Sequence, residues 1–222
     1  MKNNLSELVF ILDRSGSMSG LEKGTIGGFN SMLEKQKKEE GEALVTTVLF
    51  DNKYELLHDR INIKGISPIT DEEYYVRGTT ALLDAIGMTI VKIENAHKHT
   101  LESERPSKVL FVITTDGMEN SSRRYNYEKI RSMIEDKKKE FGWEFIFLGA
   151  NIDAVKAARD IGISEDRVGA ILPVIREYAA FWREYPDLFV DFLVRGTRTE
   201  PKEGEFAFYF YQRVFLRSVM RY

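Results

Sequence analysis

The sequence predicts an α/β protein: a three-layer, doubly wound, mostly parallel sheet followed by a small, aromatic-rich and mainly helical C-terminal extension. Three observations lead to this fold class. Short runs of consecutive apolar and β-branched residues recur, with the length typical of strands buried on both faces. Patterns of helical period alternate with these runs, as in chains that build parallel sheets. Near residue 170 aromatic residues become much denser.

The predicted elements follow in order along the chain. The predicted strands cover residues 8–12, 43–50, 54–57, 108–115 and 143–148. The predicted helices run from about Ile26 to a stop at Gly41, from 82 to 93, from 127 to 141, and from 153 to 161. Residues 59–75 contain Gly65 and Pro68, so we expect them to form mostly a connection.

A change in composition predicts a boundary near Gly169. Before it lysines outnumber arginines, whereas after it Lys202 is the only lysine beside seven arginines. We therefore expect two units, residues 5–169 and residues 170–222.

Overall composition narrows the possible functions. The chain has 222 residues, a formal charge of -3 and no cysteine. The charge gives no reason to expect nucleic acid or an anionic membrane as a partner. The lack of cysteine excludes disulfides, thiolate zinc sites and cysteine nucleophiles in this sequence. No stretch approaches the roughly 20 apolar residues of a membrane span, so we expect a cytoplasmic protein. Its oligomeric state stays open.

Oxygen-bearing side chains mark the ends of two predicted strands. Asp13, Ser15 and Ser17 follow the first strand, Asp116 follows the strand 108–115, and Thr80 lies in a loop that enters a helix. If the two strands are neighbours, both aspartates lie within reach of one ion, at the edge where α/β sheets bind ligands. Two carboxylates and three hydroxyls suit octahedral Mg²⁺, or Mn²⁺, better than zinc.

The same residues are open to other interpretations. Asp13 and Asp116 could cap strand ends, with Ser15 and Ser17 capping the next helix. A dinucleotide site would need the spacing G-x-G-x-x-G. Here the first glycine after Gly16 is Gly20, so three residues lie between them and the spacing does not match. Phosphatases with a nucleophilic aspartate need a second acidic residue where Ser15 stands.

Histidine chemistry also finds little support. The three histidines, which are His58, His97 and His99, lie outside the site loops. A Ser-His-Asp hydrolase would therefore have no base at hand. We expect these histidines on the surface.

The pattern resembles the von Willebrand factor type A domain, in its bacterial and phage intracellular branch, across residues 5–169. The matching segments are DRSGS at 13–17, GTTAL at 78–82 and TDG at 115–117, with flanks such as DGMENSS at 116–122 and FLGANIDAV at 147–155. The resemblance implies a Rossmann-like fold with a metal-ion-dependent adhesion site made by Asp13, Ser15, Ser17, Thr80 and Asp116. It also implies Mg²⁺ or Mn²⁺, a protein partner that supplies a carboxylate, and no catalysis.

Residues 174–222 resemble the start of a tailed-phage terminase large subunit. The resemblance lies in REYAAFWREYPDLFVDFL at 176–193 and FYFYQRVFLRSVMRY at 208–222, in which Tyr211, Gln212 and Arg213 match a segment that precedes the ATPase core. No phosphate-binding G-x-x-x-x-G-K-[ST] loop follows, so we expect no ATP hydrolysis. The alternative function is a truncated or fused DNA-packaging component with the first unit as an adaptor.

Overall fold

The computed structural model describes residues 2–149 and 152–164. The strands are β1 (Lys2–Asp13), β2 (Glu42–Phe50), β3 (Tyr54–Asn62), β4 (Pro106–Thr115) and β5 (Glu144–Gly149). The α-helices are α1 (Glu22–Gln36), α2 (Leu82–Lys98), α3 (Tyr127–Phe141) and α4 (Ile152–Asp160). The predicted boundary near Gly169, the unit 170–222 and its terminase-like segments lie outside the described residues.

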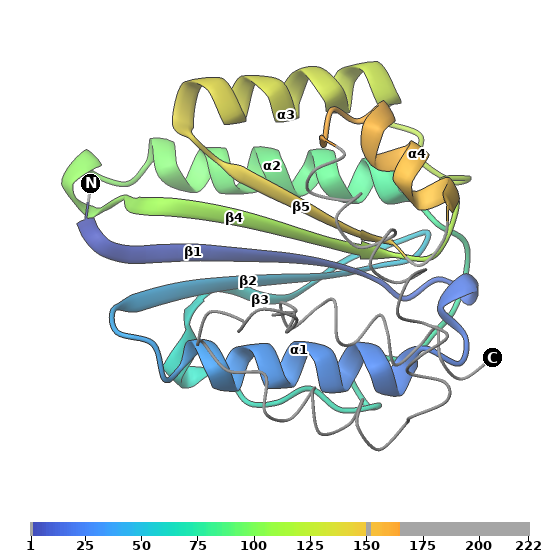
Figure 1. Cartoon of the computed structure of the whole chain (residues 1–222), viewed down its shortest axis with the longest axis horizontal. Helices are drawn as coiled ribbons and strands as arrows, with labels where there is room; N and C mark the ends of the chain where they lie inside the picture. Colours follow the sequence, from blue (N-terminus) through green and yellow to red (C-terminus); the bar gives the residue numbers. More distant parts are fainter. Residues whose placement is uncertain (1, 150–151, 165–222) are drawn as a thin grey trace, which may run out of the picture.

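The strands form one five-stranded sheet in the order β3-β2-β1-β4-β5. β1 pairs in parallel with both β2 and β4, β5 pairs in parallel with β4, and only β3 is antiparallel. Helix α1 lies on one face, and α2 and α3 lie on the other (Figure 1). The predicted fold class, a three-layer and mostly parallel α/β sheet, is therefore confirmed for the described residues.

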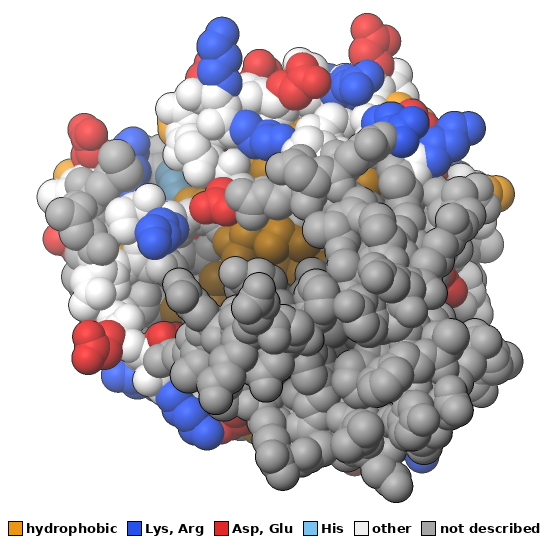
Figure 2. Space-filling view, in the orientation of Figure 1, with side chains coloured by type: hydrophobic (Ala, Val, Ile, Leu, Met, Phe, Trp, Pro, Cys, Tyr) orange, Lys and Arg blue, Asp and Glu red, His pale blue; other side chains and the backbone are white. Residues whose placement is uncertain are grey.

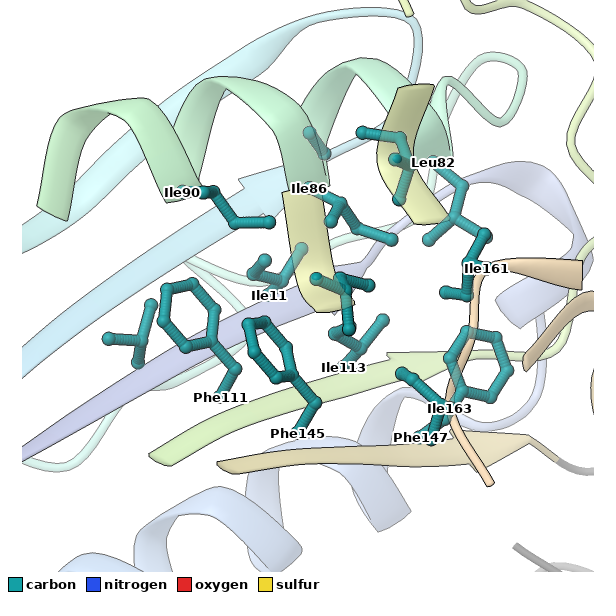
Figure 3. Close-up of a cluster of buried hydrophobic side chains, with 14 of the residues drawn as sticks. Ile11, Leu82, Ile86, Ile90, Phe111, Ile113, Phe145, Phe147, Ile161 and Ile163 are labelled. Carbon is teal, nitrogen blue, oxygen red and sulfur yellow. The ribbon is translucent and has the colours of Figure 1, made fainter. Parts of the chain in front are cut away.

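The core consists of two apolar clusters, one on each face of the sheet. On the α2 face, Ile86 and Ile90 point toward Ile11, Phe111 and other strand residues (Figure 3). On the α1 face, β1 contributes Leu8, Phe10 and Leu12, which pack near Phe29 and Leu33 of α1. Because β1 is buried on both sides, its apolar residues are consecutive rather than alternating.

The outer surface of α3 is polar. Its exposed side carries Lys, Arg, Asp and Glu side chains, which cluster along the upper edge of the view in Figure 2. In the part of the chain described here, no helix is both long and apolar enough to cross a lipid bilayer.

Several predicted boundaries were wrong. β1 begins at Lys2 rather than at residue 8, and α2 continues to Lys98 rather than ending at 93. Helix α1 ends at Gln36 rather than continuing to Gly41, because the chain must turn before β2 starts at Glu42. Strand β3 continues to Asn62, well into the predicted connection, because its second half still pairs with β2, with irregular register near His58.

The prediction that all three histidines lie on the surface was also wrong. His99 is exposed, but the His58 ring stacks on Phe29 with ring centres 6.3 Å apart. The side chain of His97 is only 12% exposed, and its Nε2 lies 2.6 Å from Glu7 Oε2. Sequence reasoning missed this contact because Glu7, in the middle of β1, lies 90 residues away from His97.

Glu7 is a fully buried carboxylate with two partners. Besides His97, Arg60 Nε donates to its Oε1 at 2.7 Å.

We expect Glu7→Ala to lower the free energy of unfolding by about 3–5 kcal/mol, because it leaves the Arg60 charge partly buried without its partner. Urea denaturation measures this change. The control is Glu34→Ala, which removes an exposed pair with Lys37 and should cost less than about 1 kcal/mol. Equal losses in both variants would contradict the expectation.

Candidate metal centre

The site lies at the carboxyl edge of the two central strands. β1 and β4 are parallel neighbours, with Leu12 opposite Thr114. Asp13 ends β1, and Asp116 immediately follows β4. The Thr115 hydroxyl donates a 2.6 Å hydrogen bond to Asp13 Oδ2. β1 and β4 are therefore the neighbouring strands that a shared site for Asp13 and Asp116 requires.

The three predicted hydroxyls gather at this edge. Ser15 Oγ lies 2.9 Å from Ser17 Oγ, and Thr80 Oγ1 donates to Ser15 Oγ at 2.9 Å. Gly117 shows how tightly they converge: a Cβ atom placed on it would lie 2.6 Å from Ser17 Oγ, 2.8 Å from Thr80 Oγ1 and 3.4 Å from Asp13 Oδ2. Three of the five predicted residues, Asp13, Ser17 and Thr80, thus border one small space beside Gly117, and Ser15 is hydrogen-bonded to Ser17 and Thr80.

The fifth predicted residue, Asp116, directly precedes Gly117 in the chain. It lies between Thr115, which bonds to Asp13, and Gly117, which faces Ser17 and Thr80. Asp116 is half-buried. The backbone thus brings Asp116 beside the other four residues.

The oxygen spacing suits a small hard cation. In an octahedral shell with metal–oxygen distances of about 2.0–2.1 Å, adjacent ligand oxygens are about 2.9 Å apart. The Ser15–Ser17 and Thr80–Ser15 oxygen pairs both have this separation, 2.9 Å. In residues 2–149 and 152–164, this site included, no group of three or more His, Cys, Asp or Glu side chains is placed to hold a metal, so a cation here would depend on the serine and threonine hydroxyls as well as on the two aspartates. The residues present therefore fit Mg²⁺ or Mn²⁺.

The Asp13 carboxylate is fully buried. Burial raises the pKa of Asp13, although hydrogen bonds from Thr115 and Ser15 partly offset this effect. The Ser15 backbone N–H donates to Oδ1 at 2.7 Å. The nearby charge of Asp51 raises the pKa further. A positive charge at the hydroxyl cluster would relieve this cost of keeping Asp13 ionised.

Backbone hydrogen bonds join the site loops. Gly16 N donates to Gly78 O at 3.1 Å, and Arg77 N donates to Arg14 O at 2.8 Å. Gly78 has a φ of 68°, and a side chain there would collide with the amide of Asn52. This glycine therefore permits the loop that carries Thr80 to lie against the loop after β1.

The loop after Asp116 is fixed to the start of α2. Glu119 Oε2 accepts from Leu83 N at 2.9 Å, and Ser122 Oγ accepts from Asp84 N at 2.9 Å. Asn120 Oδ1 accepts from Thr80 N at 3.0 Å. Glu119 thus places negative charge at a helix N-terminus, where it is favoured. These contacts hold Thr80 and the Asp116 loop in one relative position.

Arg14, between Asp13 and Ser15, belongs to a charge network that sequence reasoning missed. The Arg14 side chain is completely buried and contacts Asp51 at 3.3 Å and Glu55 at 2.5 Å. Arg77 joins the same acids, with its Nε 2.6 Å from Asp51. The Tyr74 hydroxyl donates to the backbone carbonyl of Asp13. One signal was available: Asp51 follows an apolar strand directly, as Asp13 and Asp116 do.

Comparisons with known proteins add little about function. No protein-family model matches the sequence, and a comparison with curated proteins finds no relative. Proximal thread matrix protein 1 from the mussel byssus aligns in two crystal forms. One has 14% identity and a TM-score of 0.42, covering 66% of this chain and 36% of that one. The other has 15% identity and a TM-score of 0.47, covering 74% and 40%.

A third solved structure is the ArnB paralog VWA2 from Sulfolobus acidocaldarius. It aligns at 20% identity with a TM-score of 0.42, over 66% of this chain and 35% of that one. The chain therefore spans well under half the length of each of these structures. Identities and TM-scores this low carry no argument about the site or its activity.

The burial of Asp13 leads to a prediction about the metal-free protein. In EDTA at pH 7 we expect Asp13→Asn to be more stable than the wild type by about 1 kcal/mol, because the amide avoids the cost of a buried charge. Thermal unfolding measures the difference. The control is Asp59→Asn, whose side chain is 52% exposed and pairs with Lys92; it should not stabilise the protein. A clearly less stable Asp13→Asn variant would contradict the expectation.

Proposed function

We propose that this chain is a metal-ion-dependent protein-binding module in which Asp13, Ser15, Ser17, Thr80 and Asp116 hold Mg²⁺ or Mn²⁺. The observation that carries the proposal is the convergence of the Ser17, Thr80 and Asp13 oxygens on one point beside Gly117. The sequence resemblance to type A domains also supports it, because the resemblance assigns the metal site to the same five residues.

Charge arithmetic explains how such a site would bind a partner. Asp13 and Asp116 carry two negative charges, which only neutralise a divalent ion. A bound ion supplies an electrophilic coordination position for a further oxygen ligand. The serine and threonine hydroxyls contribute oxygens without adding charge. The site is therefore suited to an acidic side chain from another protein.

Exposed apolar side chains next to the site favour a protein partner. Met118, two residues after Asp116, is 66% exposed. On the other side, Tyr75 is 44% exposed and lies under the Arg77 guanidinium, 5.3 Å from ring centre to Cζ. A single exposed apolar residue is ordinary, but methionine and aromatic residues that flank a polar centre are typical of protein interfaces.

The candidate metal centre is better suited to binding than to catalysis. A hydrolytic site would need a general base close to Asp116. The three histidines are engaged elsewhere: His58 contacts Thr47, His97 contacts Glu7 and His99 contacts the carbonyl of Asn95. We further propose that the module acts in the cytoplasm, as the composition predicts.

Calorimetric titration of EDTA-stripped protein with Mn²⁺ and Mg²⁺ tests the proposal. We expect one-site binding to the wild type and none to Gly117→Ala, since the added methyl group would lie 2.6 Å from Ser17 Oγ and 2.8 Å from Thr80 Oγ1. Asp116→Ala should also abolish binding. Gly27→Ala is the matched control, because a methyl group there meets no atom within 4 Å.

Thermal unfolding shows whether each variant is folded. At a cation concentration of about 100 times Kd, binding should stabilise the wild type by about 2.7 kcal/mol. Asp116→Ala and Gly117→Ala should gain nothing. No isotherm for the folded wild type, or equal binding by Gly117→Ala, would overturn the proposal.

A further inference from the structure

A polar cavity adjoins the candidate metal centre. Its volume is about 510 Å³, and Thr79 and Ala81, the two neighbours of Thr80, form part of its wall. Asn52, from the β2–β3 turn, lies on one side, and residues 120–123 lie on the other. A group bound in this cavity would therefore lie beside anything that reaches the metal centre.

The one acidic side chain in the cavity wall already has its hydrogen bonds. Asp84 Oδ1 accepts from Arg124 N at 2.9 Å and from Tyr125 N at 3.0 Å, and its Oδ2 accepts from Arg123 N at 2.9 Å. Asp84 also lies in the first turn of α2, where the helix dipole favours negative charge. Its charge is thus compensated without help from the cavity.

The hydrogen-bond donors in the cavity wall, by contrast, are not all used by other residues that the structure describes. The Arg123 guanidinium forms no ion pair with any residue that the structure describes. Asn120 uses its Oδ1 to accept from Thr80 N and from the Ser121 hydroxyl, and its NH₂ group has no acceptor among the described residues. The side chain of Asn52 likewise has no hydrogen bond within that part of the chain. The cavity wall therefore offers amide donors and, at Arg123, a positive charge that is paired with no described carboxylate.

We propose that this cavity binds a second carboxylate of the same partner, with Arg123 as the main contact and Asn52 and Asn120 as further donors. The inference rests on the proposed function, in which the first carboxylate reaches the cation. The planar guanidinium of arginine matches a carboxylate with two parallel hydrogen bonds. The partner is therefore a protein segment with two acidic side chains close together, rather than one.

Fluorescence anisotropy with labelled probe peptides tests this inference on the full chain in saturating Mg²⁺. One probe carries a single aspartate among glycines, and a series of probes carries two aspartates separated by zero to three glycines. We expect the best two-aspartate probe to bind the wild type about tenfold more tightly than the one-aspartate probe. A factor of about ten is the gain in affinity expected from one additional hydrogen bond to a charged group.

Two variants separate this subsite from the general charge of the loop. Arg123→Ala should reduce the tenfold difference to less than about twofold and leave the Mn²⁺ isotherm unchanged. Arg124→Ala is the matched control: it removes the neighbouring guanidinium, which lies 3.9 Å from Met88 Sδ and outside the cavity wall, and should keep the difference. Arg123→Lys should keep part of it.

The outcomes distinguish this inference from the proposed function. A Mn²⁺ isotherm with no advantage for any two-aspartate probe, or an advantage that Arg123→Ala leaves intact, overturns the second-carboxylate subsite alone. If the cation binds but no probe does, the subsite and the carboxylate recognition of the proposed function both fail, and only the cation site stands. Absence of the isotherm itself overturns both.

Discussion

The parallel pairing of β1 with β4 is the constraint on which the rest of the site depends. It places Asp13 and Thr115 side by side, so that the Thr115 hydroxyl can donate to the Asp13 carboxylate at 2.6 Å. It also directs both following loops to the same edge of the sheet, where Gly117 comes within reach of Ser17 and Thr80. Because both faces of β1 are packed against apolar clusters, a shift of this register would expose core residues, and the strand ends are held in place accordingly.

The site concentrates buried charge, which is costly unless each group has partners. Asp13, Arg14 and Asp51 are all fully buried at one edge of the sheet. The positive charges of Arg14 and Arg77 balance the negative charges of Asp51 and Glu55. The network of these four residues is therefore close to neutral by itself. No cation remains there for Asp13, whose pKa is raised chiefly by burial. The arrangement thus separates a nearly neutral charge network from Asp13, whose buried charge an added cation would stabilise; this is the physical basis of the proposed metal dependence.

Much of this could be predicted from sequence, because it depends on local pattern. The apolar runs that end in Asp13 and Asp116 indicated buried strands, and the alternation with helices indicated a parallel sheet, in which the carboxyl ends of these strands lie at one edge. The contacts that the sequence did not reveal are between residues distant in the chain. Glu119 caps α2 from 36 positions away, and Arg14 meets Asp51 across 37. No periodicity records such pairs. The end of α1 at Gln36 was missed for a similar reason, since the position of β2 rather than helix propensity decides it.

The loop that carries Thr80 is hydrogen-bonded to the loop after Asp116, and this bears on how a partner would bind. Thr80 is held on both sides: its N–H donates to Asn120 Oδ1, and its carbonyl accepts from the N–H groups of Asn120 and Ser121. The same Asn120–Ser121 segment forms the wall of the neighbouring polar cavity. A ligand that pulled Thr80 toward a cation would therefore move this wall as well, and a group bound by the wall would in turn restrict Thr80. Cation binding and recognition in the cavity involve one set of hydrogen bonds, so we expect the two to be coupled, by the same factor in both directions.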